Sequence, residues 1–239
     1  MKALVFGGSG SIGSAIVDRL LKDGYEVILQ YYQSDISSLE KKYKGEAVEF
    51  IQMDLTHDID FNDIFSHIKH LDCLIYSSGT SLYGMLQDMK DKEIDECYHI
   101  HVKQLIRCCR YFIDILRKST NGRIIVISSI WGETGASMET IYSAMKSAQI
   151  GFVKALSQEL ALTNVTVNAI APGFVSGRMA KAFSDEDKAV ILSELPQQRM
   201  IAPQEVAHVC AYLCHPNAKS ITGTVQKVNG CLLYTSDAA

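Results

Sequence analysis

A tyrosine and a lysine four residues apart are the first residues in this sequence that could do chemistry together. Tyr142 and Lys146 form a Y-x-x-x-K pattern, and helical positions i and i+4 share one face, so both side chains can reach one pocket. An ordinary tyrosine has a pKa of about 10, and a neighbouring ammonium favours the phenolate and lowers that pKa. The pair predicts proton exchange with a substrate oxygen near neutral pH. Alone, the pattern fits an exposed helix face equally well.

Ser129 adds a hydroxyl at a position where α/β proteins keep functional groups. It lies 13 residues before Tyr142, just after the apolar run Ile124–Ile127. That run predicts a strand buried on both faces, and ligands of doubly wound sheets bind outside the carboxyl ends of the strands. The spacing therefore predicts that Ser129, Tyr142 and Lys146 share a site.

A glycine-rich segment follows the first predicted strand and opens the first predicted helix. In Gly7–Gly13, the residues Gly8, Gly10 and Gly13 fit G-x-G-x-x-G. Glycines permit the tight turn and close approach to a pyrophosphate, and the helix N-terminus offers free N–H groups. The flanking strand and helix favour dinucleotide binding over a glycine-rich turn without a ligand. The predicted contacts are Gly7, Ser9, Gly10, Ser11, Ile12 and Gly13.

The end of the second predicted strand bears on the choice between NADPH and NADH. NAD sites usually place a carboxylate there, on the ribose 2′-hydroxyl. Here the segment reads Gln30–Ser34, and Asp35 comes late enough to cap the following helix instead. This favours NADPH, with NADH as the alternative, because no carboxylate is placed to repel a 2′-phosphate. No nearby arginine or lysine is evident to bind that phosphate.

Strands and helices alternate along the whole chain. The predicted strands are Val5–Phe6, Val27–Leu29, Val48–Ile51, Cys73–Ile75, Ile124–Ile127 and Val165–Val167. The predicted helices are Ile12–Lys22, Ile36–Tyr43, Phe61–Lys69, Asp91–Leu116 and Ile141–Ala161. This order and the length of 239 residues predict one α/β domain over residues 1–239, a doubly wound (Rossmann) parallel sheet with helices on both faces.

These motifs together resemble the classical short-chain dehydrogenase/reductase family over nearly the whole chain. The resemblance implies an NAD(P)H-dependent oxidoreductase acting on a ketone or CH–OH group. It makes Tyr142 the acid/base and Ser129 a hydrogen-bond donor to the carbonyl oxygen. It also makes Lys146 the residue that lowers the tyrosine pKa and holds the nicotinamide ribose.

Further segments match the family. Asp54 and Leu55 correspond to residues against the adenine, although Asp54 fits an ordinary helix cap as well. Gly79 ends Tyr76–Gly79, the counterpart of the family's N-N-A-G. Pro172, Gly173 and Val175 resemble the segment beside the nicotinamide. The segments Ile221–Gly223 and Val228–Gly230 resemble the family's last loop and strand, which brings the expected sheet to about seven strands.

Three departures from the family stand out. Phe6 replaces the cradle threonine and Ser11 its middle glycine. His101 stands at the position of the family's catalytic asparagine, and we expect it to take over the proton relay to Lys146; a buried helix histidine is the alternative. Residues 231–239 do not follow the family pattern and are interpreted as an artefact.

The segment Ser128–Ser137, with His101, is similar to the elongation factor P 5-aminopentanone reductases of Gram-positive bacteria. This implies a ketone carried on a lysine of elongation factor P, reduced to 5-aminopentanol, with Trp131 and Glu133 at the substrate. Glu133 would pair with the substrate amine, or it is a surface residue capping a loop.

The segment 174–199 is expected to hold a substrate lid, helical over Asp187–Leu195. A 3-oxoacyl-[acyl-carrier-protein] reductase and a non-catalytic NADP-binding regulator are the competing functions.

The composition indicates which ligands and which location in the cell to expect. The net charge of −4, from 23 basic and 27 acidic residues, gives no basic surplus for nucleic acid. The seven cysteines form no C-x-x-C pair, so we expect reduced thiols and no metal site. No signal peptide or membrane span is apparent, which predicts a cytoplasmic protein. The resemblance implies a homo-oligomer, a tetramer or dimer, built on the two long helices.

Overall fold

Seven strands form one parallel sheet in a computed structural model that describes residues 1–178, 180 and 184–232. The strand order is β3-β2-β1-β4-β5-β6-β7. The strands are β1 (Lys2–Phe6), β2 (Glu26–Tyr31), β3 (Val48–Gln52), β4 (Cys73–Tyr76), β5 (Gly122–Ile127), β6 (Val165–Pro172) and β7 (Val225–Val228). The predicted doubly wound sheet is confirmed. Of the segment 231–239, residues 233–239 lie outside the described part of the chain.

The strand order places the ligand crevice. From β1 the chain adds β2 and β3 on one side, then returns to add β4 to β7 on the other. The switch point therefore lies between β1 and β4, where doubly wound sheets bind their ligands. The glycine-rich segment leaves β1 at this point, and Ser77–Gly79 leaves β4 beside it.

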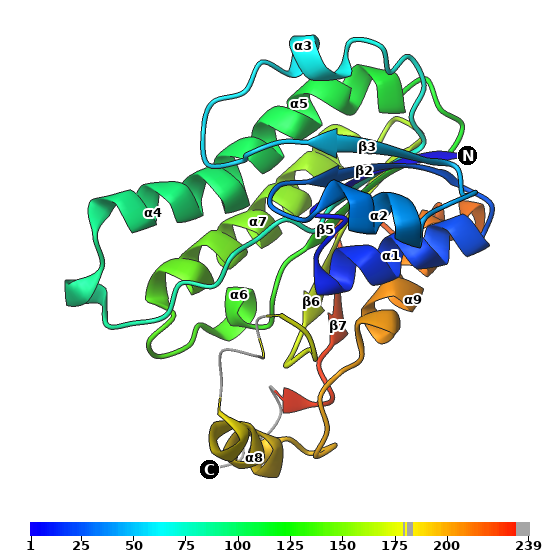
Figure 1. Cartoon of the computed structure of the whole chain (residues 1–239). Helices are drawn as coiled ribbons and strands as arrows, with labels where there is room; N and C mark the ends of the chain where they lie inside the picture. Colours follow the sequence, from blue (N-terminus) through cyan, green and yellow to red (C-terminus); the bar gives the residue numbers. More distant parts are fainter. Residues whose placement is uncertain (179, 181–183, 233–239) are drawn as a thin grey trace.

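Helices cover both faces of the sheet (Figure 1). One layer contains α1 (Ser11–Lys22), α2 (Ile36–Lys42) and α9 (Pro203–Cys214). The other contains α3 (Phe61–Phe65), α4 (Asp91–Tyr98), α5 (Gln104–Leu116) and α7 (Thr140–Glu159). The structure also contains α6 (Trp131–Thr134), α8 (Asp185–Glu194), η1 (Leu86–Asp88) and η4 (Pro216–Ala218). Among the described residues, no helix is long and apolar enough to cross a membrane.

Most helix predictions hold to within a residue or two, but α3 is shorter than the expected Phe61–Lys69. The helix ends at Phe65, and the Ile68 amide donates to the Phe65 carbonyl at 2.9 Å in a turn. Ile68 and Leu71 then enter the core, with 2% and 0% exposure. The buried turn ends the helix because both apolar side chains must reach the same core as Phe65.

The long helix predicted over Asp91–Leu116 contains a π-helical stretch, η2 (His99–Lys103), between α4 and α5. A π turn is a wider turn inserted into an α-helix, and such turns are frequent at functional sites. Two carbonyls of this stretch accept hydrogen bonds from side chains. The Tyr76 hydroxyl donates to Ile100 O at 2.5 Å, and Gln149 Nε2 donates to His101 O at 2.9 Å.

Candidate active site

The glycine-rich segment forms a cradle in which two glycines are required by packing. Gly7 has a φ of +71°, and a Cβ on it would lie 2.8 Å from the Ser78 backbone. A Cβ on Gly13 would lie 2.1 Å from Gly7 O. Gly10 caps α1 without any side-chain hydrogen bond, which leaves the first N–H groups of the helix for a ligand. The cradle thus fits a pyrophosphate.

A cleft of about 660 Å³ opens beside this cradle. Six of the predicted cofactor residues line it: Gly7, Ser9, Gly10, Asp54, Leu55 and Gly79. Of the other cradle residues, Gly13 packs against Gly7, and Ser11 Oγ accepts a hydrogen bond from the Arg178 amide at 3.0 Å. The cleft is large enough for a dinucleotide, and it is lined by the glycines that such a ligand needs.

Gln30 and Arg178 belong to this cleft although the sequence did not single them out. Gln30 is buried, its Oε1 accepts from Gly7 N at 2.8 Å, and its Nε2 donates to Met53 O at 2.8 Å. The amide therefore ties the cradle to the end of β3. Arg178 lines the cleft from a segment 167 residues distant from Ser11, so only the fold reveals it.

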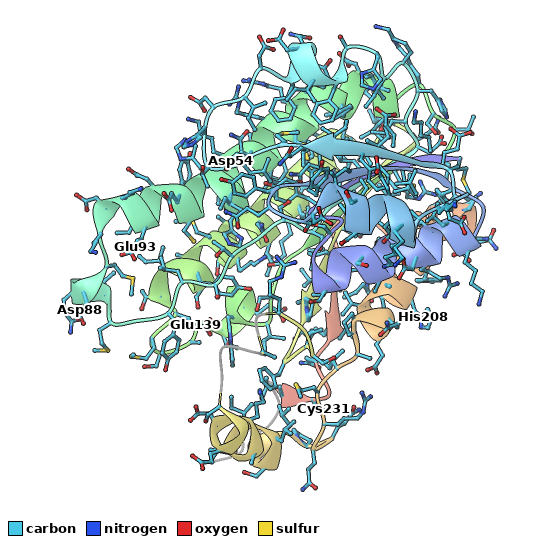
Figure 2. All side chains as sticks on the ribbon, in the orientation of Figure 1. Asp54, Asp88, Glu93, Glu139, His208 and Cys231 are labelled. Atoms are coloured by element: carbon cyan, nitrogen blue, oxygen red, sulfur yellow. The ribbon has the colours of Figure 1, made fainter. Side chains whose placement is uncertain are left out.

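Asp54 both caps a turn and lines the cleft, so the two sequence-based alternatives are compatible. Its Oδ1 accepts from Thr56 N at 2.9 Å and from Thr56 Oγ1 at 2.8 Å. Partial burial opposes ionisation, but these bonds and one from the Tyr32 hydroxyl hold the pKa of Asp54 below its usual value. Figure 2 shows Asp54 just beyond the end of β3.

A second cavity of about 600 Å³ adjoins the cleft, and Ser81 lines both. The predicted residues that line this second cavity are Ile12, Ser129, Trp131, Tyr142, Pro172, Gly173 and Val175. Helix α8 forms one wall through Asp187, Val190 and Ile191, as expected of a lid helix. The two cavities together provide space for a dinucleotide and for a small substrate side by side.

Burial raises the pKa of Tyr142, which is the opposite of the effect expected from Lys146. A hydrogen bond from Ser129 partly opposes this shift, and the charge of Glu139 adds to it. Lys146 Nζ lies 5.5 Å from the centre of the Tyr142 ring and donates to other groups. Tyr142 is therefore a protonated phenol at neutral pH, and it lines the second cavity together with Ser129.

The Lys146 ammonium is enclosed in the protein. It donates to Ile127 O of β5 at 2.9 Å and to Gln149 Oε1 at 3.3 Å. Burial lowers the pKa of Lys146 to about 7, because an ammonium away from water loses its hydration. Lys146 lines neither cavity, but it lies one helical turn from Tyr142 at the end of β5.

His101 is fully buried and stands between the cleft and Tyr142. Its Nε2 lies 2.9 Å from Thr80 O and 3.1 Å from Thr80 N. Its Nδ1 has no partner within the described residues. Burial, followed by the charge of Lys146, lowers the pKa of His101 to about 3, so the imidazole is neutral.

Glu133 lies outside the second cavity, away from the place that pairing with a substrate amine requires. It pairs with Lys227 of β7, Nζ to Oε2 at 3.4 Å, and is absent from the described lining of the second cavity. The reason is helical geometry: Trp131 and Glu133, two positions apart on α6, point to opposite sides. Since Trp131 lines the cavity, Glu133 points away from it.

Glu139 occupies the place foreseen for Glu133. It is the N-cap residue of α7 and lines the second cavity (Figure 2). Burial raises the pKa of Glu139, and a hydrogen bond with Trp131 partly opposes this. The sequence placed Glu139 three residues before Tyr142, but gave no sign that its side chain faces the cavity.

Comparison with known proteins agrees with this geometry. A family model described as enoyl-(acyl carrier protein) reductase matches residues 7–232. The oxidoreductase YmfI of Bacillus subtilis, whose function is uncharacterised, is 36% identical over 234 residues, covering 95% of this chain and 97% of YmfI. The 3-oxoacyl-[acyl-carrier-protein] reductase FabG of Escherichia coli is 32% identical over 232 residues, covering 95% of each chain.

Solved structures show the same architecture. The structure of ElxO with NADP bound has a TM-score of 0.89 at 26% identity, covering 98% of each chain. A short-chain dehydrogenase/reductase mutant of Serratia marcescens has a TM-score of 0.87 at 26% identity, covering 97% of each. The chain therefore belongs to the classical short-chain dehydrogenase/reductase family, and it is an NAD(P)H-dependent oxidoreductase acting on a ketone or CH–OH group.

Proposed function

We propose that this protein is an NADPH-dependent ketone reductase in which Tyr142 donates the proton to the carbonyl oxygen. The observation that supports this most directly is that the buried Tyr142 and Ser129 line the second cavity together, with burial keeping the pKa of Tyr142 above its usual value. A protonated phenol is the form that reduction requires, because the ketone oxygen gains a proton as its carbon becomes an alcohol carbon. Ser129 donates a second hydrogen bond to the same oxygen and stabilises its growing negative charge.

The cleft residues fit NADPH. Gly7, Ser9, Gly10 and the start of α1 would hold the pyrophosphate, Asp54 and Leu55 the adenosine, and the segment Pro172–Val175 the nicotinamide end. When bound, the nicotinamide supplies the hydride. Tyr31–Ser34 line the cleft at the end of β2 without a carboxylate, which favours the 2′-phosphate. The NADP bound to ElxO supports the same preference.

Lys146 and His101 would assist the transfer of the Tyr142 proton. Lys146 places a positive charge within one turn of the phenol, where it stabilises the phenolate left after proton donation. His101 takes the relay position. Its buried Nδ1 lacks a partner in the described chain, and such an atom usually holds an ordered water.

For the substrate we propose a ketone that carries an ammonium, specifically the 5-aminopentanone group on a lysine of elongation factor P. Glu139 gives the second cavity a negative wall beside Tyr142, and none of its described lining residues is basic. Burial raises the pKa of the Glu139 carboxyl, and a substrate ammonium beside it would favour the ionised form. Helix α8 would then cover the modified lysine rather than a free metabolite.

A 3-oxoacyl-[acyl-carrier-protein] reductase is the second candidate, and the 32% identity with FabG favours it. Both candidates use the same proton donor and cofactor, so only the substrate separates them. The six buried free cysteines suit a reducing cytoplasm for either reaction.

Members of this family are commonly oligomeric, and we propose a tetramer or dimer assembled on α4–α5 and α7.

The deciding experiment follows NADPH oxidation with ketone-modified elongation factor P, a 3-oxoacyl carrier protein and a small neutral ketone. Glu139→Gln should raise KM for the amine-bearing substrate about 10- to 100-fold, as expected for loss of a charge-assisted bond, and leave the neutral ketone little changed. Glu133→Gln is the matched control, since Glu133 faces Lys227 outside the cavity. Equal losses on all substrates in Glu139→Gln, or turnover of the acyl carrier protein alone, would overturn the aminoketone assignment.

A further inference from the structure

Gln149 of α7 is a fully buried amide beside the catalytic lysine. It exposes 1% of its surface, in a helix whose other buried positions are mostly apolar or small. Burying an amide is unfavourable unless both its donor and its acceptor find partners. Both of them do here. Gln149 Oε1 accepts from Lys146 Nζ at 3.3 Å, and Gln149 Nε2 donates to His101 O at 2.9 Å.

The carbonyl of His101, which accepts the hydrogen bond from Gln149 Nε2, lies in the π-helical stretch η2. This bond orients the Gln149 amide, and the amide presents its oxygen to Lys146. Two helices and the end of β5 meet at one ammonium through this connection.

We propose that Gln149 is a positioning residue that holds the Lys146 ammonium through its own bond to the His101 carbonyl. The fold leaves Lys146 two protein acceptors among the described residues, Ile127 O and Gln149 Oε1. A backbone carbonyl is fixed by the strand, so Gln149 is the adjustable partner. Its amide oxygen favours the charged form of Lys146 without adding a second charge to the site.

Several other titratable groups face the ammonium. They are Cys97 of α4, His101 of η2 and Tyr142 of α7. Burial raises the pKa of Cys97 to about 11, and that of His101 is about 3. Neither group changes charge near neutral pH, and Tyr142 is also neutral there. A change in the titration of Lys146 near pH 7 therefore reports on Lys146 and its acceptors.

The test uses two substitutions with opposite expected effects. Gln149→Leu keeps the volume but removes the acceptor, so Lys146 should lose its proton about one pH unit lower. Gln149→Glu places a carboxylate at the same atom, so Lys146 should hold its proton about one unit higher or more. Above the wild-type midpoint, the alkaline limb of the kcat/KM profile should fall about 10-fold in Gln149→Leu and recover in Gln149→Glu.

A second measurement does not depend on activity. Lysine labelled at Cε with ¹³C gives an NMR titration of the protein without added NADPH, and Lys146→Arg identifies the resonance. Gln104→Leu is the matched control, because Gln104 is an equally buried amide of α5 that donates to His57 O, away from Lys146. It should alter stability and leave both titrations unchanged.

Opposite shifts in the two Gln149 variants support the proposal. Unchanged titrations, or shifts in one direction only, overturn it and reduce Gln149 to a packing residue. If Gln149→Leu does not fold, Gln149→Glu decides alone: an upward shift of the Lys146 titration supports the role, and no shift overturns it.

Discussion

The imidazole of His101 meets the ring of Tyr142 edge-on, with the ring centroids 5.5 Å apart and the planes at 88°. This is a favoured arrangement of aromatic rings, because a positive edge faces a negative face. It fixes the plane in which the Tyr142 hydroxyl can move. Gly79 leaves room for the imidazole, since a Cβ on Gly79 would lie 2.7 Å from His101 Cε1.

Gly79→Ala should therefore disturb catalysis through His101. The new methyl group would displace the imidazole from its place beside Tyr142, and we expect kcat to fall about 10- to 100-fold, as small misplacements of reacting groups do. Steady-state kinetics with NADPH and a ketone would measure this. Gly151→Ala on α7 is the control: no atom lies within 4 Å of its Cβ, and alanine should stabilise the helix by about 0.5–1 kcal/mol. Unchanged kcat in Gly79→Ala would show that His101 does not position Tyr142.

Tyr142→Phe should abolish turnover and leave NADPH binding nearly intact. The phenol supplies the proton, and general acid catalysis contributes about 10²- to 10⁴-fold. NADPH affinity is measured by fluorescence titration and turnover by NADPH oxidation. Tyr212→Phe, an exposed tyrosine on α9, serves as control. Substantial turnover in Tyr142→Phe would assign the proton to another group.

Lys146 should make stability depend on pH. Its pKa of about 7 in the fold lies below the roughly 10.4 of an unfolded chain, so between these values the unfolded chain binds more protons. The free energy of unfolding then rises with pH by up to about 1.4 kcal/mol per unit, and this contribution is lost as the pH falls toward 7. Denaturant unfolding of wild type and Lys146→Met at pH 7 to 9.5 isolates the effect, because the variant lacks it. Parallel stability curves would mean that the lysine titrates normally.

Gln33→Asp should shift cofactor use from NADPH toward NADH. Gln33 lines the cleft at the end of β2, and a carboxylate there would repel a 2′-phosphate while leaving a 2′-hydroxyl unaffected. We expect kcat/KM for NADPH to fall about 10- to 100-fold, with NADH little changed. Gln33→Asn has the shape of the aspartate without its charge and should keep the preference for NADPH. Equal losses for both cofactors in Gln33→Asp would place the 2′-phosphate elsewhere.

The fold and the core of the site could be predicted because they depend on local patterns. The strands are continuous apolar runs, the cradle is a glycine pattern between a strand and a helix, and Ser129 follows a strand end. The spacing predicted that Ser129 and Tyr142 share a pocket, and both line the second cavity. The raised pKa of Tyr142 was not predicted, because it depends on how deeply the ring is buried.

The remaining site residues depend on contacts that no local pattern contains. Arg178 reaches the cleft from a distant segment, and Gln149 gains its role from an irregular turn in another helix. The apolar pattern of Asp91–Leu116 continues through that turn and gives no sign of it. The pairing of Glu133 with Lys227 of β7 depends on the tertiary fold, and so does the position of Glu139 at the second cavity.

The π-helical stretch η2 also changes the phase of the helix that contains it. Cys97 and Cys108 are eleven residues apart, which in a regular α-helix is about three turns and puts both on nearly the same side. Here Cys97 lines the cofactor cleft while Cys108 packs in the core under the sheet. The π stretch takes up one residue without advancing the turn of the helix, so the first half of the helix faces the cleft and the second half faces the protein interior. Winding the same residues as a regular α-helix would rotate one half by about 100° relative to the other.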